Sequence, residues 1–187
     1  MKSLRSEHGD VRFVLENLSF SSILYSIIEK ELDVGITLET DVLKAPTIDS
    51  CVLTEIPRVL VYSKNYNLKN NTILEPMDFK DEWFLVPRTN RGSYINDLLN
   101  SFCEPYGFKP NVQEVRNTES LTNSVVNGLG VAVVDYFTYE SLKKHCHCIV
   151  LESTATIAAM WRKDNTNILI KSFIQELQHS LENFEIK

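Results

Sequence analysis

The strongest constraint on how this chain folds is a regular alternation between two spacings of apolar residues. Short apolar or β-branched segments predict strands, and the run 83–86 is wholly apolar, as in a strand that is buried on both faces. Between such segments, apolar residues three and four positions apart predict helices, most clearly at Ile95, Leu98, Leu99 and Phe102. Strands that alternate with helices indicate an α/β fold, with parallel sheets built from βαβ units.

The predicted elements, taken in order, divide the chain into two lobes. The predicted strands cover 11–16, 32–38, 51–63, 83–86, 112–115, 131–134, 149–151 and 157–162. Helices are predicted over 20–31, after an N-cap at Ser93, from a cap at Thr118 to Gly128, over 136–144 and at the C-terminal end. The segment 51–63 predicts one long strand or two strands in series, long enough to cross between lobes, and a second crossing is expected near 149–156. We therefore expect lobe I at 1–58 with 155–187, and lobe II at 59–154.

Composition and charge narrow the classes of function. The chain has 187 residues, of which 43% are apolar, and a formal net charge of −6. This is the profile of a globular protein without general attraction for nucleic-acid phosphates. Its longest wholly apolar runs, 131–134 and 157–161, are far shorter than the roughly 18 residues of a transmembrane helix. The first ten residues lack the apolar core of a signal peptide, so the four cysteines are interpreted as reduced thiols in the cytoplasm.

One segment combines residue types that bind metals: His145, Cys146, His147 and Cys148. On an extended chain the two cysteines lie on one face and the two histidines on the other, so a single ion cannot take all four. A contribution of two ligands, completed by a partner, stays open. We expect a loop-to-strand junction here, and neither a metal nor a cofactor.

Signals for catalysis are weak. Asp33 and Asp135 flank apolar segments, but nothing places the two carboxylates side by side for acid and base roles. The run 128–130 has two glycines of a dinucleotide-binding motif, but Val133 stands at the third position, and the run precedes a strand instead of following one. We predict no catalytic residue and expect the chain not to be an enzyme.

Four segments, in their order and spacing, resemble the effector-binding domain of LysR-type transcriptional regulators. They read FSSILYSIIEKELDVGITLET, LTEIPRVLVYSKNYNL, EPMDFKDEWFLVP and EVRNTESLTNSVVNGLGVAVVDYF. The first holds the family's "LD-hydrophobic-x-I" pattern at 32–36, and the last holds its "G-x-G" followed by an apolar strand at 128–134. Each motif alone is weak, but together they extend the resemblance over nearly the whole chain.

The resemblance implies a type II periplasmic-binding-protein fold, in which two Rossmann-like lobes are joined by two crossing strands and hold a ligand between them. It also implies a cytoplasmic homodimer that switches transcription when a small, anionic metabolite binds, by differential affinity for two arrangements and without a chemical step. The alternatives are a solute-binding receptor or an enzyme on the same fold.

Two departures from the family pattern change what we expect. The helix-turn-helix domain and the first strand of lobe I are not found in this sequence. We therefore expect DNA contact only through a domain outside this chain, and a first sheet that rearranges or accepts a partner chain, because a missing central strand leaves backbone groups unpaired. In addition, Asp135 stands where the family has proline.

The ligand-site prediction follows from the implied fold. In open α/β sheets, ligands lie beyond the carboxyl ends of strands, where helix N-termini offer N–H groups to anions. The residues predicted to bind the ligand are Thr37, Thr89, Asn90, Arg91, Ser93, Asn117, Thr118, Asp135 and Thr156. Helix capping alone is the alternative for the serine and threonines, and a solvated surface charge is the alternative for Arg91. If Arg91 faces the ligand, a carboxylate-bearing effector is its natural partner.

Overall fold

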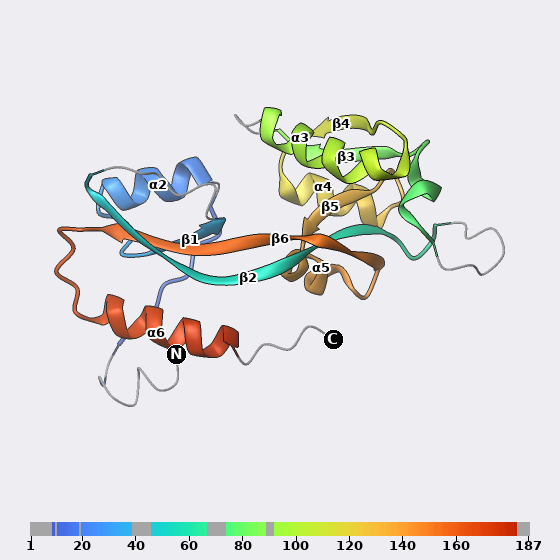
Figure 1. The fold of residues 1–187 in the computed structure, drawn as a ribbon. Helices are drawn as coiled ribbons and strands as arrows, with labels where there is room; N and C mark the ends of the chain where they lie inside the picture. Colours follow the sequence, from blue (N-terminus) through green and yellow to red (C-terminus); the bar gives the residue numbers. More distant parts are fainter. Residues whose placement is uncertain are drawn as a thin grey trace. The chain divides into compact units, whose positions relative to one another are not determined.

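The computed structural model describes residues 9, 11–18, 20–38, 46–66, 74–88 and 92–182, with only the backbone for 20, 21 and 92–95. It separates the chain into two compact units, as Figure 1 shows. Unit 1 consists of Met1–Ile56 with Ala155–Lys187, and unit 2 consists of Pro57–Thr154. Its mixture of strands and covering helices confirms the predicted α/β class.

Two long strands belong to both units. β2 (Ile48–Ser63) and β6 (Cys146–Arg162) are neighbours in a four-stranded sheet of order β1-β6-β2-β5 (Figure 1). The prediction of two separate strands at 149–151 and 157–162 is wrong, because β6 is continuous. The polar residues between them stay extended since pairing with β2 satisfies their backbone groups, and Ala155 is fully buried among them.

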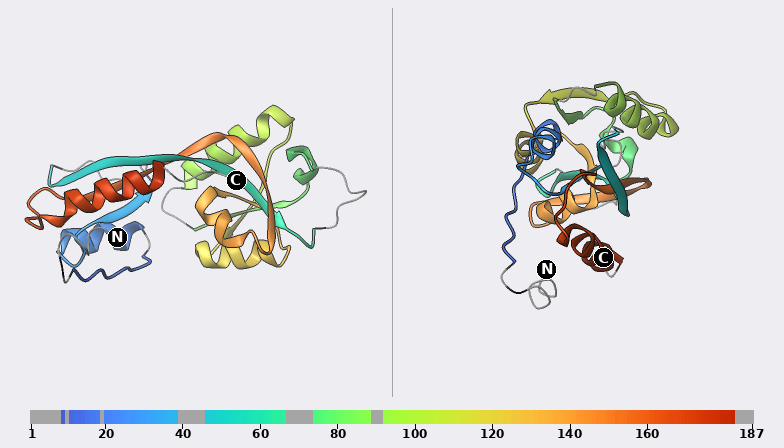
Figure 2. Two further views of the ribbon diagram at one scale, coloured as in Figure 1. Left: turned by 90° about the horizontal axis from the view of Figure 1, so that it is seen from below. Right: turned by 90° about the vertical axis from the view of Figure 1, so that its left-hand side faces the viewer.

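Unit 1 covers its strands with a helix on each face. α2 (Phe20–Ile28) packs through Ile27 against Ile48 and Met160, and α6 (Leu169–Glu182) packs on Leu53 and Ala159 of the crossing strands (Figure 2). The short strand β1 (Gly35–Leu38) pairs with β6 in antiparallel register. A Cβ atom on Gly35 would lie 2.5 Å from Ile23 Cγ2 and 2.8 Å from Ile27 Cδ1, so glycine permits the close approach of α2 to β1.

The strand predicted over 11–16 is absent. Residues 11–18 have no regular structure, and the side chains of Val14 and Leu15 are 65% and 74% exposed. Their main anchor is Phe13, whose ring centroid lies 5.9 Å from that of Phe173 in α6. Alternating apolar residues favour a strand only where a neighbouring strand accepts the hydrogen bonds, and no described strand pairs with this segment.

Unit 2 is built around parallel strands. β3 (Trp83–Pro87) pairs with β4 (Asn111–Val115) in parallel, and a parallel bridge joins Phe84 to Val131, just before β5 (Ala132–Asp135). β5 pairs in turn with β2 in antiparallel register. The prediction of parallel sheets is therefore confirmed for β3 and β4, but the β1–β6 and β2–β5 pairs are antiparallel. The reason is that these two pairs involve the crossing strands, which are not linked to their neighbours by a βαβ unit.

Helices bury both faces of the unit 2 strands. On one face, α4 (Thr118–Val126) and α5 (Tyr136–Leu142) pack on Val59, Val61 and Leu85. On the other face, α3 (Gly92–Cys103) and the short 3-10 helix η2 (Pro76–Phe79) pack on Leu60 and Phe84. A second short 3-10 helix, η3 (Glu104–Tyr106), follows α3. Alternating residues of the segments 59–62 in β2 and 84–86 in β3 thus enter different cores, which explains why these two segments are apolar throughout.

Candidate functional site

The carboxyl ends of β3, β4 and β5 meet at one edge of unit 2. Their shared direction places the chain after each strand at this edge, where α/β folds hold ligands. The backbone N–H of Arg88, just after β3, donates to the carbonyl oxygen of Val115 at the end of β4 over 2.7 Å. α4 begins at Thr118, three residues beyond the end of β4 in the chain, and α5 follows β5 directly. We call this region the sheet edge.

Asn117 and Thr118 form the start of α4 at the sheet edge. The side-chain oxygen of Asn117 accepts from the N–H of Ser120 over 2.8 Å, which makes Asn117 the N-cap. The prediction that Thr118 caps this helix is wrong by one residue, because Thr118 already lies in the helix and cannot take the capping geometry. Both residues are exposed, so the hydroxyl of Thr118 and the first N–H groups of α4 are accessible to a ligand.

Asp135 ends β5 and caps α5. Its carboxylate accepts from the N–H of Thr138 over 2.9 Å and from its hydroxyl over 2.7 Å. Asp135 is therefore the N-cap of α5. Asp135 also stands opposite Arg58 in the register of β5 with β2. Directly opposite residues lie on the same face of a sheet, so a cation and an anion share that face at the sheet edge.

Arg58 is a candidate that the sequence analysis missed. It is only 8% exposed, and its Nε donates to the carbonyl oxygen of Thr154 over 3.0 Å. A charged residue inside a long, largely apolar predicted strand was the available signal, because buried arginines are rare unless they have partners. Arg88, also at the edge, is far more exposed and forms only a surface pair with Glu114 at 3.4 Å.

Most of the remaining predicted site residues cannot be placed at the sheet edge. Thr89, Asn90 and Arg91 lie outside the described residues. Ser93 is the second residue of α3, so the prediction that it caps this helix is wrong: the helix begins at Gly92, and a cap precedes the first helical residue.

Thr37 and Thr156 belong to unit 1. Both are half-buried in strands, Thr37 in β1 opposite Ala158 and Thr156 in β6. Of the predicted residues, the structure therefore places Asn117, Thr118 and Asp135 at helix starts along the sheet edge.

The histidine and cysteine segment lies at the start of β6. As the alternation predicts, Cys146 is buried and Cys148 half-buried, whereas His145 and His147 are exposed. Burial raises the pKa of both thiols, so they are neutral near pH 7 in the metal-free chain. Within the described part of the chain, no three His, Cys, Asp or Glu side chains are grouped so as to hold a metal ion. The same residues contain no helix that is long and apolar enough to cross a membrane.

Comparisons with known proteins agree with this architecture. The family model described as LysR substrate binding domain matches residues 1–182. No curated protein sequence matches the chain. Among solved structures, full-length CbnR in complex with its target DNA is 13% identical, with a TM-score of 0.72, and the alignment covers 97% of this chain and 64% of CbnR.

Two isolated regulatory domains are similar over more of their own length. The effector-binding domain of a BenM variant is 18% identical with a TM-score of 0.71, over 98% of this chain and 88% of that one. The Synechocystis PCC6803 CcmR regulatory domain, solved in complex with 2-PG, is 13% identical with a TM-score of 0.67, over 98% and 89%.

These matches show the same fold, and they differ in how much of each protein the chain spans. It spans less than two thirds of full-length CbnR but nearly nine tenths of the two isolated domains. The family match leaves only the last few residues uncovered. The chain therefore belongs to the LysR substrate-binding family and is an effector-binding domain of the LysR type, with the periplasmic-binding-protein-like fold that its sequence resembles.

Proposed function

We propose that the chain binds a small, anionic metabolite and passes the state of its binding to the DNA-binding part of a LysR-type regulator. The observation that carries this proposal is the sheet edge of unit 2. There, the start of α4 with Asn117 and Thr118 lies after one parallel strand, and the opposed Arg58 and Asp135 lie at the end of another. Helix N-termini and arginine side chains are the two groups that most often bind carboxylates and phosphates in proteins.

The two compact units are, in this proposal, the two lobes of the family fold, with lobe I at 1–58 and 155–187 and lobe II at 59–154. From lobe I, the ligand would then contact Thr37 and Thr156. From lobe II, it would contact Thr89, Asn90, Arg91, Ser93, Asn117, Thr118 and Asp135. The ligand would act by favouring one of two arrangements, and its effect is limited by its difference in affinity for them.

The proposed role includes no chemical step and no cofactor. Asp135 is the best acid or base candidate at the sheet edge, but both of its oxygens accept hydrogen bonds from Thr138 in its capping role. We propose a cytoplasmic homodimer that contacts DNA through a helix-turn-helix domain outside these residues. The alternatives of a transport receptor or an enzyme are less favoured, because the family match is to a regulatory domain.

Thermal-shift screening against small carboxylates and phosphates tests this function. A true effector raises the free energy of unfolding by about 2.7 kcal/mol at a concentration one hundred times its Kd. Because CcmR was solved with 2-PG, that compound belongs in the panel. Failure of every anion to stabilise the chain, or turnover of a bound one, would contradict the proposal.

A matched pair of variants then locates the site. Thr118→Val removes a hydroxyl at the start of α4, and Thr122→Val removes one inside the same helix, where it donates to the carbonyl oxygen of Glu119 over 3.0 Å. Both replacements have similar helix propensity. We expect Thr118→Val to weaken effector binding by several-fold, since a hydrogen bond to a charged ligand is lost, and Thr122→Val to leave it unchanged. Equal effects would place the ligand elsewhere.

A further inference from the structure

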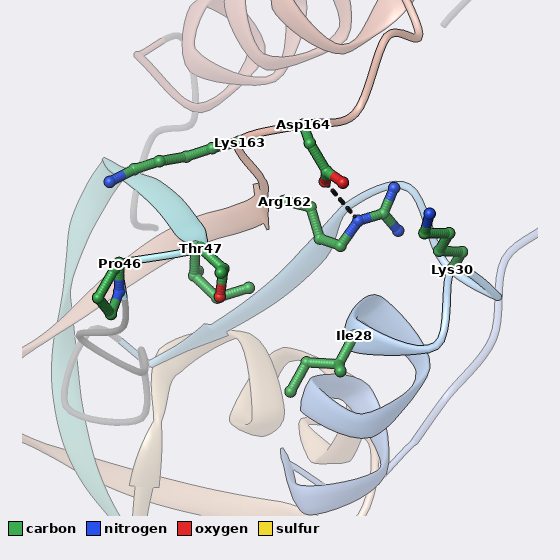
Figure 3. Close-up of a pocket in the computed structure, with 8 residues that line it drawn as sticks. Ile28, Lys30, Pro46, Thr47, Arg162, Lys163 and Asp164 are labelled. Atoms are coloured by element: carbon green, nitrogen blue, oxygen red, sulfur yellow. Dashed lines mark hydrogen bonds and ion pairs between the residues drawn. The ribbon is translucent and has the colours of Figure 1, made fainter.

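Unit 1 contains a hollow of its own, separate from the residues of the sheet edge. Its volume is about 430 Å³, within the range of small-molecule sites. Its walls come from the end of α2, from the turn before β2 and from the segment after β6 (Figure 3). All of these segments belong to unit 1.

Positive charge dominates this hollow. It is lined by Lys30, Arg162 and Lys163, against the single carboxylate of Asp164. Arg162 Nε lies 2.7 Å from Asp164 Oδ1, so these two charges compensate each other. The ammonium groups of Lys30 and Lys163 have no ion-pair or hydrogen-bond partner within the described part of the chain. Three cations against one carboxylate leave an excess of positive charge at the hollow, in a chain of net charge −6, and make it a local attractor for anions.

The cationic end of the hollow is held in place by backbone contacts. Arg162 is only 13% exposed, and its Nη1 donates to the carbonyl oxygen of Ile27 over 3.2 Å. The N–H of Lys163 donates to the carbonyl oxygen of Thr47 over 3.0 Å, which joins the segment after β6 to the turn before β2. In Figure 3, Lys30 lies beside Arg162, and Lys163 lies on the other side of the hollow. The Arg162 side chain and the backbone of Lys163 are therefore fixed before any ligand arrives, which reduces the entropic cost of binding.

The backbone of Lys30 supplies an independent observation. Lys30 has a φ of 69°, and it is the only non-glycine residue with positive φ in the described part of the chain. Its N–H donates to Ile27 at 3.3 Å, and that of Glu31 donates to Ser26 at 2.8 Å, which is the Schellman motif that ends α2. Glycine is the usual residue at this left-handed position, and a lysine there costs stability. A lysine at this costly backbone position, in the wall of the hollow beside Arg162, suggests a function.

The remaining walls of the hollow are apolar. Ile28 is 46% exposed there, and Ile48 and Pro46 complete the surface. We propose that this hollow binds a small organic anion, whose carboxylate pairs with Lys30 and Arg162, and whose hydrocarbon part covers Ile28 and Pro46. Lys163 adds long-range attraction from the other side. This would be a second anion site, independent of the effector site proposed for unit 2.

The first test is calorimetric titration of the whole chain with cyclohexanecarboxylate, which has one carboxylate and a compact apolar ring. Cyclohexanecarboxamide has the same shape without the charge. We expect saturable binding of the carboxylate and at least about tenfold weaker binding of the amide, because a charged hydrogen bond is lost. Absence of saturable binding, or equal binding of the two compounds, would overturn the proposal.

The second test uses variants that leave the fold intact. Lys30→Gly keeps the left-handed backbone and removes the charge, so it should raise the melting temperature of the free chain while weakening carboxylate binding about tenfold. Lys163→Gln should weaken binding by a smaller factor, and Lys30→Arg should restore most of it. Lys109→Gln, at an exposed position in unit 2, is the charge-matched control and should have no effect. Unchanged binding by Lys30→Gly would overturn the proposal.

Backbone NMR separates this site from the one in unit 2. Added cyclohexanecarboxylate should shift the amide signals of residues 28–31, 47–48 and 162–164. Shifts confined to residues 116–119 and 135–138 would overturn the second site and support the effector site. Shifts confined to unit 1 would support the second site. The effector function proposed for unit 2 is tested separately, by the thermal-shift screen of carboxylates and phosphates.

Discussion

Similar apolar patterns form a strand in unit 2 but not in unit 1. In unit 2, the apolar segment predicted as a strand over 83–86 lies between two neighbours, and its alternating residues Phe84 and Leu85 enter separate cores. In unit 1, the segment 11–18 has a comparable alternation but no strand beside it, and Leu15 is 74% exposed. The difference shows that an apolar pattern does not by itself make a strand, and that a neighbouring strand decides whether one forms.

One substitution made in both segments tests this contrast and has the largest expected effect. Leu85→Ala in β3 removes a side chain that is only 2% exposed, and we expect it to lower the free energy of unfolding by about 3–4 kcal/mol. Leu15→Ala should change it by less than about 0.5 kcal/mol, because the side chain is already in water. Urea denaturation measures both values. A loss above about 1.5 kcal/mol for Leu15→Ala would indicate that residues 11–18 are packed as a buried strand.

The cost of adding a Cβ atom at a tightly packed glycine also differs between the two units. A Cβ on Gly130 in unit 2 would lie 2.5 Å from the backbone oxygen of Trp83, which the β3 hydrogen bonds hold in place. A Cβ on Gly35 in unit 1 would meet only side-chain carbons of Ile23 and Ile27, which can rotate away. We expect Gly130→Ala to cost about 3 kcal/mol and Gly35→Ala about 1–2 kcal/mol.

Thermal and urea unfolding of the two glycine variants give the order of these costs. Ser101→Ala, at an exposed position of α3, is the control and should lie within about 0.5 kcal/mol of the parent chain. The reverse order, with Gly35→Ala more damaging, would mean that α2 is held on β1 more rigidly than β5 is held on β3.

Much of unit 2 could be predicted from the sequence, since each of its elements carries its own local signal. The helical spacing of Leu98, Leu99 and Phe102 and the apolar run 83–86 both correspond to observed elements. The continuity of β6 could not be predicted, because the strand partner that keeps its polar middle extended is remote in sequence.

The candidate sites were less predictable than the fold. The place of Asn117 and Asp135 at helix starts could be predicted, because helix starts after strands are visible in a sequence. Arg58 was missed, since its burial depends on a contact with Thr154. The hollow of unit 1 was missed as well, because Lys30 and Lys163 come together only in the folded chain and the left-handed backbone of Lys30 has no sequence signal.

Replacement of Lys30, whose backbone is left-handed, should have a smaller effect on stability than the preceding variants, and should stabilise the chain instead of destabilising it. Lys30→Gly should raise the free energy of unfolding by about 1 kcal/mol, since glycine adopts positive φ without a Cβ clash. For contrast, Gly107 in unit 2 has a φ of 74° and open space around its Cβ position, so Gly107→Ala should cost about 1 kcal/mol from backbone strain alone. Thermal unfolding measures both, and a destabilised Lys30→Gly would contradict the backbone assignment.

The smallest expected effects concern two exposed ion pairs, one in each unit. The Arg162 hydrogen bond lowers the pKa of Asp164 in unit 1, and the Lys143 hydrogen bond lowers that of Glu140 in unit 2. A carboxyl whose pKa is lowered on folding stabilises the native state above its unfolded pKa. This contribution is lost as the pH falls through the lower folded value. Carbon-detected NMR titration should therefore find both carboxyls ionised at a pH where free carboxyls are partly protonated.

Salt distinguishes the two pairs, because their cations differ in freedom. Arg162 is 13% exposed and is also bonded to the carbonyl oxygen of Ile27, whereas Lys143 is 56% exposed and stands on a helix surface. At about 1 M salt the Debye length falls to about 3 Å, which screens exposed charges most strongly. We expect the pKa of Glu140 to return toward its ordinary value while that of Asp164 stays low. If both shifts vanish together, Arg162 is not held against α2 in solution, and the hollow beside Lys30 is not fixed before a ligand binds.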